Sequence, residues 1–280
     1  MKIAHIPRKR FAQHFLTDSR TAEKIVQFAG IGPEDTVLEI GPGKGILTEH
    51  ILKMAKQVVA VEIDRDLVGI LKEKFANIEK FTLMQTDFLK VDLGNLFSDT
   101  EGRIKVVSNI PYNISGQIID KLIRNRAVIS HAVLMVQKEV ALRLTAVPGS
   151  RDYGLATLNL ALCAQSQKVM DIKPGAFFPS PEVMSSIISI TFNQYNLYDL
   201  KNEKLFREIT GAGFRMRRKM IRNTIIPYLV SKGITEQKAH QILDEAGINP
   251  TVRPETLHVA AFVALSNTLN DMIAYEACRE

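Results

Sequence analysis

A buried strand followed by a glycine-rich loop is the feature that most limits what this chain can fold into. Residues 36–40, Thr-Val-Leu-Glu-Ile, are typical of a buried strand, and residues 41–45, Gly-Pro-Gly-Lys-Gly, form a tight loop before an expected helix over 46–56. Glycines in such a loop let backbone N–H groups approach a ligand, and the helix N-terminus that follows favours an anionic group. The unit therefore predicts an α/β fold with a ligand at the carboxyl ends of its strands.

The residue at position 46 separates two kinds of ligand for this loop. The dinucleotide-binding fingerprint would place Gly or Ala there, whereas this chain has Ile46. Glu62 lies in the next expected strand, over residues 57–63, at a spacing that suits a carboxylate binding a ribose diol. The pattern therefore favours S-adenosylmethionine over a nicotinamide dinucleotide, with the methionine carboxylate near the loop that contains Gly41 and Gly43.

Two more expected strands lead to polar residues that can join this site. Residues 81–84 lead to Asp87, which can accept the amino group of the cofactor adenine, and the apolar run 104–107 leads to Asn109. Because ligands gather at the carboxyl ends of strands beside the switch point, Asp87 and Asn109 are expected on one rim with Gly41 and Glu62. Elsewhere we expect helices over 67–75, 116–124, 138–144 and 155–164, and strands over 131–137, 167–172 and 186–192.

The four residues Asn109-Ile110-Pro111-Tyr112 suit the binding of an exocyclic amine. The side-chain oxygen of Asn109 can accept one N–H, and the carbonyl of Ile110, which the following proline restricts, can accept the other. Tyr112 offers a flat face for a base taken out of its helix. Carbonyl dipoles already in place would stabilise positive charge that grows on adenine N6 during attack on an electrophile. Considered alone, the four residues fit a plain strand end followed by a Pro-Tyr turn better than they fit this site, so the surrounding residues must decide.

Composition bounds the class of protein. The chain has 280 residues, enough for one large and one small domain, with 46% hydrophobic and 24% charged residues. No apolar run approaches membrane-spanning length, and residues 1–15 lack a signal-peptide core. Cys163 and Cys278 are too few for a disulfide framework or a zinc site, so we expect no metal, and a reducing cytoplasm. The net charge of +6 allows a nucleic-acid partner, and we expect a monomer.

Two aromatic segments lie outside the strand ends. Residues 8–16 are basic but include Phe11, Phe15 and Leu16, so we expect this segment to dock on something, and His14 could reach a ligand. Residues 173–181 contain three prolines and a glycine, which argue against regular structure and fix two phenylalanines in a rigid loop. A wall for a flipped base and a hydrophobic plug over the sheet end are equally good interpretations of this loop.

The C-terminal part is predicted to be a small helical domain. Helices are expected over 204–213, 216–232, 235–246 and 254–267. The second carries a dense group of cations without interleaved acid: Arg215, Arg217, Arg218, Lys219 and Arg222. At helical spacing all but Arg217 would share one face, and phosphate binding explains them better than a solvated face. We expect two domains, 1–195 and 196–280, the second docking RNA together with Arg8, Lys9 and Arg10.

Seven segments taken together resemble the KsgA-type small-subunit rRNA adenine dimethyltransferases. They occur in that family's order and spacing from about residue 8 to residue 265: residues 13–16, 39–45, 61–64, 109–112, 135–141, 177–183 and 214–219. The resemblance implies a class I S-adenosylmethionine-dependent methyltransferase, with a Rossmann-like α/β sheet and a small C-terminal all-α domain. Thr86 and Met184 replace a Gly and an Asp that are common in the family, and neither touches the expected chemistry.

The resemblance also implies an activity and a set of site residues. The family transfers two methyl groups to N6 of each of two adjacent adenosines, in a hairpin loop near the 3′ end of 16S rRNA in an assembling 30S particle. It acts in small-subunit biogenesis, and loss of the methyl groups accompanies kasugamycin resistance. Contacts with the cofactor are implied for His14, Leu16, Gly41, Glu62, Asp87 and Asn109. Tyr112 and Phe177 would stack on the two sides of the target base.

Other functions stay open on the sequence. The related large-subunit rRNA adenine methyltransferase of macrolide resistance shares the chemistry, but an Asn-Phe-Ile string is common there in place of His14-Phe15-Leu16. A DNA adenine methyltransferase would have a larger insertion and Pro rather than Ile at position 110. A mainly non-catalytic assembly factor would occupy the immature subunit, and it would not need an intact Asn109 tetrapeptide.

Overall fold

The structure is a computed structural model, and it describes residues 13–277. Contacts between Cα atoms group the chain into two compact units. The first comprises the described residues up to Ala141 together with Gln165–Tyr195, and the second comprises Leu142–Ala164 and the described residues from Asn196 onward. The second unit therefore includes residues 142–164, which an expected domain boundary at residue 195 assigns to the first.

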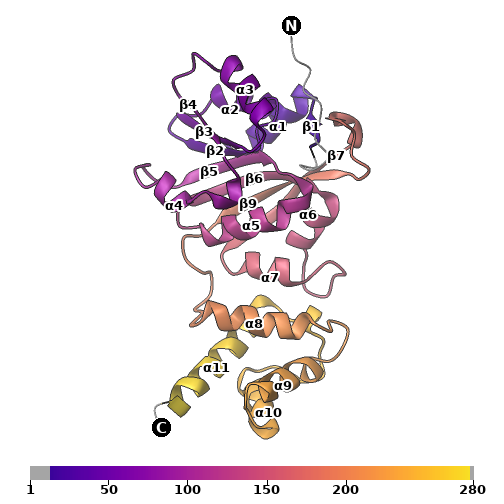
Figure 1. The fold of residues 1–280 in the computed structure, drawn as a ribbon. Coiled ribbons are helices and arrows are strands. Elements are labelled where there is room, and N and C mark those ends of the chain that lie inside the picture. Colours follow the sequence, from indigo (N-terminus) through magenta and orange to yellow (C-terminus); the bar gives the residue numbers. More distant parts are fainter. Residues whose placement is uncertain (1–12, 278–280) are drawn as a thin grey trace. The chain divides into compact units, whose positions relative to one another are not determined.

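A seven-stranded sheet forms the first unit (Figure 1). In spatial order its strands are β4 (Phe81–Gln85), β3 (Gln57–Glu62), β2 (Thr36–Ile40), β5 (Ile104–Asn109), β6 (Ile129–Gln137), β9 (Ser185–Phe192) and β7 (Ala164–Ile172). The pairs from β4 to β6 are parallel, whereas β9 runs antiparallel to β6. The chain order reverses between β2 and β5, so the carboxyl ends of these strands form the switch point at which ligands bind in such sheets.

Helices cover both faces of this sheet (Figure 1). On one face lie α1 (Ser19–Phe28), α2 (Ile46–Leu52) and α3 (Arg65–Lys74). They bury Ile25, Ile51 and Leu71 in one hydrophobic cluster with the strand residues Val37 and Val107. On the other face lie α4 (Leu93–Leu96), α5 (Ser115–Arg124) and α6 (Lys138–Leu144). This two-sided burial explains why β2 is so largely apolar, since strands covered on both faces read as continuous hydrophobic runs.

All the helices and strands expected in the first unit are present, and the 36–40 strand and the 138–144 helix begin and end as expected. The largest difference is at the end of α2, which stops at Leu52 instead of residue 56. The backbone N–H of Lys56 donates to the oxygen of Asp35 at 2.9 Å. That bond directs the chain into β3 instead of continuing the helix. Helix propensity cannot predict it, because it depends on a contact with a residue about 20 positions earlier.

The N-terminal segment docks on the aromatic loop as a two-stranded ribbon. Here β1 (Phe15–Leu16) pairs antiparallel with β8 (Phe177–Phe178), so that Phe15 faces Phe178 and Leu16 faces Phe177. The docking of Phe15 and Leu16 is thus confirmed, while Phe11 and the cations at positions 8–10 lie outside the described residues. The expectation that residues 173–181 lack regular structure is wrong, because a 3₁₀ turn (Pro174–Ala176) and β8 form there, β8 through two residues that are not proline.

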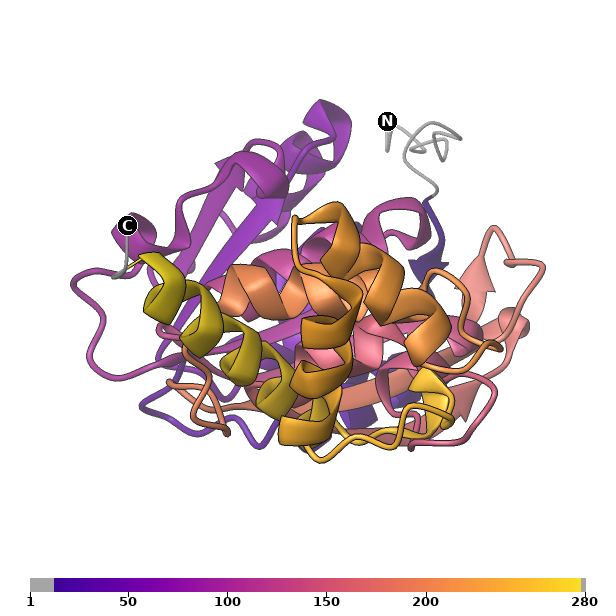
Figure 2. The ribbon, with the colours of Figure 1, turned by 90° about the horizontal axis from the view of Figure 1, so that it is seen from below.

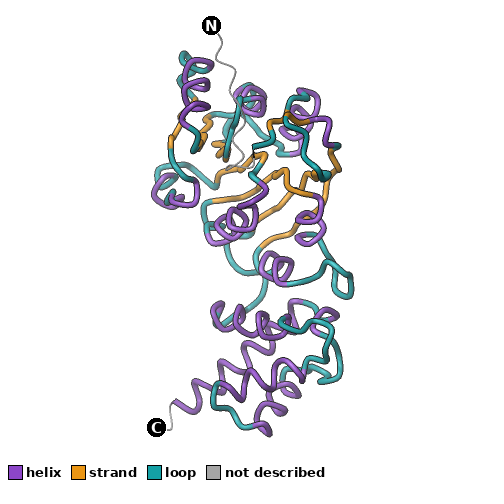
Figure 3. The backbone as a smooth tube through the Cα atoms, turned by 45° about the vertical axis from the view of Figure 1, so that its right-hand side comes forward, coloured by secondary structure: helices purple, strands orange, loops and turns teal. Residues whose placement is uncertain are grey.

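The second unit is helical (Figures 2 and 3). Its elements are α7 (Leu155–Ala161), α8 (Glu203–Phe214), α9 (Arg222–Ser231), α10 (Glu236–Glu245), a 3₁₀ turn (Pro254–Thr256) and α11 (Val259–Ala277). Phe206, Ile225, Leu243 and Phe262 are fully buried in it or nearly so. The expected helix over 216–232 is wrong in its first part, because residues 215–221 form turns and α9 begins only at Arg222. No helix within residues 13–277 has the length and apolar character needed to cross a membrane.

Candidate active site

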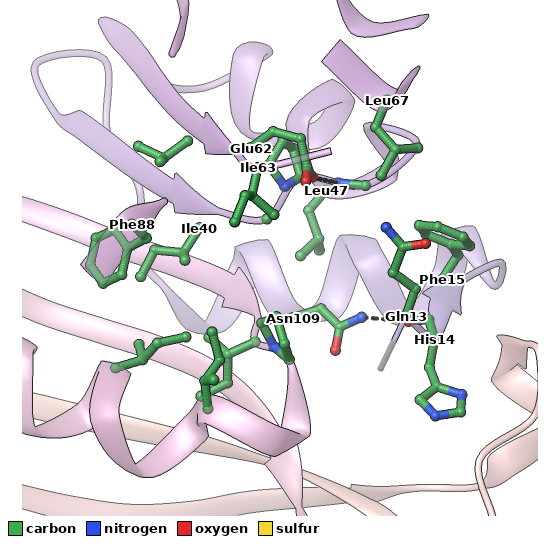
Figure 4. A pocket seen from close by; sticks show the side chains of 18 of the residues that line it. Gln13, His14, Phe15, Ile40, Leu47, Glu62, Ile63, Leu67, Phe88 and Asn109 are labelled. Atoms are coloured by element: carbon green, nitrogen blue, oxygen red, sulfur yellow. Dashed lines mark hydrogen bonds between the residues drawn. The ribbon is translucent and has the colours of Figure 1, made fainter. Parts of the chain in front are cut away.

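A pocket with a volume of about 240 Å³ lies at the switch point, where the carboxyl ends of β2, β3 and β5 meet (Figure 4). Nearly all the residues predicted for the cofactor and for the chemistry line it. They are His14, Leu16, Gly41, Gly43, Glu62, Asp87, Asn109, Ile110, Pro111 and Tyr112. Segments far apart in the sequence therefore converge on one cavity, as the strand-end argument predicts.

The glycine loop after β2 has a backbone that other residues would strain. Gly43 and Gly45 have φ angles of 59° and 81°, in the left-handed region that favours glycine. A Cβ on Gly43 would lie 3.0 Å from Cδ1 of Phe15, and a Cβ on Gly45 would lie 2.8 Å from Cε2 of Phe75. The loop can therefore pass close to Phe15 of the N-terminal segment and to Phe75 at the end of α3 only because Gly43 and Gly45 carry no side chain.

Glu62 ends β3 with its carboxylate held by backbone N–H groups on both sides. One oxygen accepts from Asp64 N at 2.9 Å, and the other accepts from Gly43 N at 3.3 Å. The side chain is buried, which raises the pKa of Glu62, while these hydrogen bonds oppose the increase. A buried carboxylate tied to the glycine loop is a fixed acceptor, suited to the hydroxyl groups of a ribose.

Asp87 follows β4 and caps a 3₁₀ turn (Phe88–Lys90) by accepting from Leu89 N at 2.9 Å. The neighbouring Phe88 is buried, and both residues line the pocket. Ile63, which directly follows β3, contributes a further apolar side chain to the lining (Figure 4). One carboxylate between apolar faces is the kind of environment that binds an adenine ring through its amino group.

Asn109 is fixed at the end of β5 by the N-terminal segment. Its Nδ2 donates to the backbone oxygen of His14 at 2.9 Å (Figure 4). Because only the NH₂ group can donate to a carbonyl oxygen, this bond decides which way the amide points and leaves Oδ1 as an acceptor. The next residue, Ile110, donates its backbone N–H to Met135 O at 3.2 Å, which anchors the peptide that precedes Pro111.

Tyr112 is held by contacts of its hydroxyl group and of its ring. Its hydroxyl group shares a 2.5 Å hydrogen bond with Oγ of Ser185, and its ring stacks on the imidazole of His14 with the centroids 5.5 Å apart and 25° between the planes. Burial raises the pKa of Tyr112, so its phenol stays neutral. The ring is therefore a flat, uncharged surface in a defined orientation. Ser185 was not anticipated, since nothing local in the sequence places β9 beside Tyr112.

Phe177 does not lie where a partner of Tyr112 is expected. It is 4% exposed, belongs to the core cluster with Leu16 and Val107, and is not among the residues that line the pocket. Its neighbour Phe178 is 59% exposed. Side chains alternate between the two sides of a strand, so the pairing of Phe177 with Leu16 turns one phenylalanine inward and the other outward.

Glu39 is a buried acid beside the glycine loop that the sequence-based prediction did not use. One of its oxygens accepts from Oγ1 of Thr48 at 2.6 Å, and the other has no partner. Burial, helped by the negative charge of Glu62, raises the pKa of Glu39 to about 8. The signal that could have identified it is an acid at a position of β2 that points, like Val37, toward the core.

The cations after α8 form an irregular turn rather than one face of a helix. The turn is held by backbone bonds from Ile221 N to Val252 O at 2.7 Å and from Arg222 N to Pro250 O at 3.2 Å. Arg217 donates from Nε to Oε2 of Glu255 at 2.8 Å and is partly buried. The other four cations are more open to solvent: Arg215, Arg218, Lys219 and Arg222. Among the side chains that the structure describes, no group of three His, Cys, Asp or Glu could hold a metal ion.

Solved methyltransferase structures share this fold. A dimethyladenosine transferase from Plasmodium falciparum is 26% identical, with a TM-score of 0.78 over 92% of this chain and 98% of that one. The 23S rRNA methyltransferase ErmE is 24% identical, with a TM-score of 0.69 over 91% of this chain and 99% of that one. Together with the strand order and the residues of the pocket, these likenesses define the chain as a class I methyltransferase.

Sequence comparison then gives the family. The model of the family described as "Ribosomal RNA adenine dimethylase" matches residues 4–269. "Ribosomal RNA small subunit methyltransferase A" of Desulforapulum autotrophicum is 41% identical over 95% of this chain and 93% of that protein. The protein of the same name from Pseudomonas syringae pv. syringae is 38% identical over 97% of this chain and 98% of that protein. The chain belongs to the ribosomal RNA adenine dimethylase family.

Proposed function

We propose that this chain transfers methyl groups from S-adenosylmethionine to N6 of two adjacent adenosines in a hairpin loop near the 3′ end of 16S rRNA. The family and the names of the relatives support this proposal. The observation that carries it is the orientation of Asn109, whose Nδ2 is bound to His14 O so that Oδ1 is left as an acceptor. Within the same pocket lie the acids Glu62 and Asp87 and the ring of Tyr112.

The residues of the pocket fit a methyl donor of this kind. Glu62 would accept the ribose hydroxyl groups, Asp87 would accept the adenine amino group, and backbone groups at Gly41 and Gly43 would lie near the methionine carboxylate. Leu16 and the backbone of His14 would close the pocket from the N-terminal side. The donor, when bound, supplies an electrophilic sulfonium methyl group, so the protein need only orient the nucleophile and exclude water.

Asn109 and Ile110 would act on the target amine. Two acceptors, Oδ1 of Asn109 and the carbonyl oxygen of Ile110, would take the two N–H groups of adenine N6 and favour a pyramidal nitrogen with its lone pair available. Their dipoles would also stabilise the positive charge that develops on N6. Tyr112 would stack on the base. With Phe177 buried in the core, its predicted place on the opposite side of the base would require that side chain to leave the cluster.

Exposed cations in the second unit would bind the RNA backbone. The four that have no acidic partner among the described residues are Arg215, Arg218, Lys219 and Arg222. They would bind phosphates by charge and shape, leaving the choice of base to the pocket. Arg217 would contribute less charge, because Glu255 already pairs with it.

The setting in which the enzyme works is part of the proposal. We infer that it acts as a monomer in the cytoplasm on an assembling 30S particle, that it contributes to small-subunit biogenesis, and that its activity confers sensitivity to kasugamycin. These expectations come from the family resemblance. The proposed methyl transfer needs no metal ion, since adenine N6 attacks the sulfonium methyl group directly.

The amount of methyl incorporated into isolated ribosomal subunits tests this function. The purified chain would be incubated with labelled S-adenosylmethionine and either small or large subunits that lack adenine methylation. About four methyl groups per small subunit, and none per large subunit, are expected. Incorporation into large subunits only would favour the macrolide-resistance type of enzyme. Tight small-subunit binding without incorporation would favour a non-catalytic assembly factor.

A further inference from the structure

The imidazole of His14 lies against the ring of Tyr112, the proposed platform for the target base. It stacks on Tyr112 with the ring centroids 5.5 Å apart, and its Nδ1 is 2.8 Å from the backbone oxygen of Pro179. Because a carbonyl oxygen can only accept, Nδ1 carries the proton in this bond. Figure 4 shows the imidazole pointing away from Glu62. The imidazole thus fills the gap between Tyr112 and the segment that follows β8.

This gap is too narrow to hold a base while the imidazole stays in place. Aromatic rings in contact lie about 3.5–4 Å apart, so a base inserted between two rings separates them by about 7 Å. The 5.5 Å between His14 and Tyr112 leaves no such room. A base can therefore stack on this face of Tyr112 only if the imidazole moves out.

The backbone of His14 has a separate task from its side chain. The carbonyl oxygen of His14 orients Asn109 at 2.9 Å, while the imidazole contacts Tyr112 and Pro179. Rotation about the Cα–Cβ bond would release both contacts of the ring without moving the carbonyl group. The base slot can open while the acceptor Oδ1 of Asn109 keeps its orientation.

We propose that the His14 imidazole is a placeholder for the target adenine, and that the adenine displaces it from Tyr112 on entering the site. This inference rests on the proposed function of Tyr112 as the platform for the target base. The imidazole occupies the space beside Tyr112 until a purine ring stacks on Tyr112 in its place. Only a base that regains the stacking on Tyr112 compensates for the loss of the imidazole contacts, so His14 helps to select what enters.

Adenosine monophosphate (AMP) is the probe that tests this displacement without RNA. The chain would first be saturated with S-adenosylhomocysteine so that AMP cannot bind in the cofactor pocket. AMP would then be titrated while the ring signals of the six histidines are followed by ¹H–¹³C NMR. In the wild-type chain the His14 ring signal should lose its ring-current shift as AMP binds. Tyr112→Ala should remove both that shift and the binding of AMP.

Three variants show whether the His14 side chain raises or lowers the affinity for AMP. His14→Ala removes the placeholder and should bind AMP about three- to tenfold more tightly than the wild type, because a stack and a hydrogen bond no longer compete. His14→Phe keeps a flat ring on Tyr112 and should bind within about threefold of the wild type. His50→Ala is the control, since His50 contacts Ser19 and is not among the residues that line the pocket.

The outcomes distinguish this inference from the proposed function. AMP binding that is equal, weaker or undetectable in His14→Ala would overturn the placeholder and make the imidazole a support for Tyr112. An unchanged His14 signal on AMP binding to the wild type would overturn it too, without any variant. If AMP displaces the imidazole but the wild type does not methylate small subunits, the proposed function fails and the placeholder stands.

Discussion

The side-chain nitrogen of Asn109 donates a 2.9 Å hydrogen bond to the backbone oxygen of His14, across 95 residues of sequence. The bond joins the N-terminal segment to the end of β5, and it orients the residue on which the proposed chemistry depends. Two substitutions separate the parts of this relationship. Asn109→Ala removes both the acceptor and the donor to His14, and Asn109→Asp keeps an acceptor but loses the donation to His14.

We predict that Asn109→Ala lowers the rate of methyl transfer by at least about 100-fold, because preorganised dipoles at the developing charge are lost. Affinity for S-adenosylmethionine, measured by calorimetry, should stay within about threefold, since Glu62 and Asp87 remain. Asn109→Asp should also be strongly impaired, because repulsion between its carboxylate and the His14 carbonyl removes the fixed orientation. Wild-type turnover in Asn109→Ala would contradict the assigned role.

Glu39 should make stability depend on pH. Its pKa is raised to about 8 by burial, so the folded chain holds a proton that the unfolded chain releases at an ordinary glutamate pKa. The contribution of Glu39 to the free energy of unfolding should therefore be largest at low pH. It should fall as pH rises from about 4.5 to about 8 and stay constant above that.

Glu39→Gln should abolish that part of the pH dependence. The stability of the variant relative to the wild type should rise by about 2–5 kcal/mol between about pH 5 and about pH 9, measured by urea unfolding at each pH. Parallel stability curves for the two proteins would show that Glu39 ionises at its ordinary pKa in the folded chain.

A matched pair of glycine substitutions tests the geometry of the cofactor loop. Gly45→Ala puts a Cβ 2.8 Å from Phe75 at a φ of 81°, and it should destabilise the chain by about 2–4 kcal/mol. Gly69 lies inside α3, and a Cβ at this position would meet no atom within 4 Å, so Gly69→Ala should be neutral or stabilise by up to about 1 kcal/mol. Thermal unfolding compares the two, and equal effects would contradict the crowding at Gly45.

RNA affinity should depend on charge in the α8–α9 turn. Binding to small subunits should weaken steeply as salt rises, and Arg218→Glu should lower the affinity by about tenfold and make the salt dependence shallower. Lys53→Glu, at an exposed position after α2, is a control of equal charge change in the first unit. If both reversals weakened binding alike in filter-binding assays, net charge rather than this turn would be responsible.

For Glu255→Gln, the structure and the net charge predict opposite changes in RNA affinity. Removing an acid from a basic surface should strengthen RNA binding if charge alone matters. We expect the reverse, about a threefold to tenfold weakening, because Glu255 holds Arg217 and thereby the turn that displays the neighbouring cations. Asp244→Asn, which removes an exposed acid of α10, is the control and should not weaken binding.

The sequence was sufficient for the sheet and for the rim of the pocket. The strands ending near Glu62 and Asn109 are largely buried apolar runs, whereas the strand ending near Asp87 is only partly buried. The rule that ligands gather at the carboxyl ends of strands needs no knowledge of tertiary contacts. The glycine loop and Ile46 predicted S-adenosylmethionine from local residue types alone, and membership of a methylase family agrees with a methyl donor.

What the sequence could not supply depends on contacts between distant segments. The turn at residues 215–221 replaces the expected helix because its backbone bonds to residues 250 and 252. Which of Phe177 and Phe178 turns inward follows from pairing with Phe15 and Leu16, not from the loop itself. The stack of His14 on Tyr112 likewise requires the N-terminal segment to be docked before it can be seen.

The sharpest test of the proposed activity is the identity and position of the methylated nucleoside. Small subunits lacking adenine methylation would be treated with the chain and labelled S-adenosylmethionine, and the rRNA would be digested, analysed by mass spectrometry and mapped. We expect N6,N6-dimethyladenosine at two adjacent positions of one hairpin loop, and none with Asn109→Ala. An absence of dimethyladenosine despite demonstrated cofactor binding, or its appearance at other positions, would contradict the proposed activity.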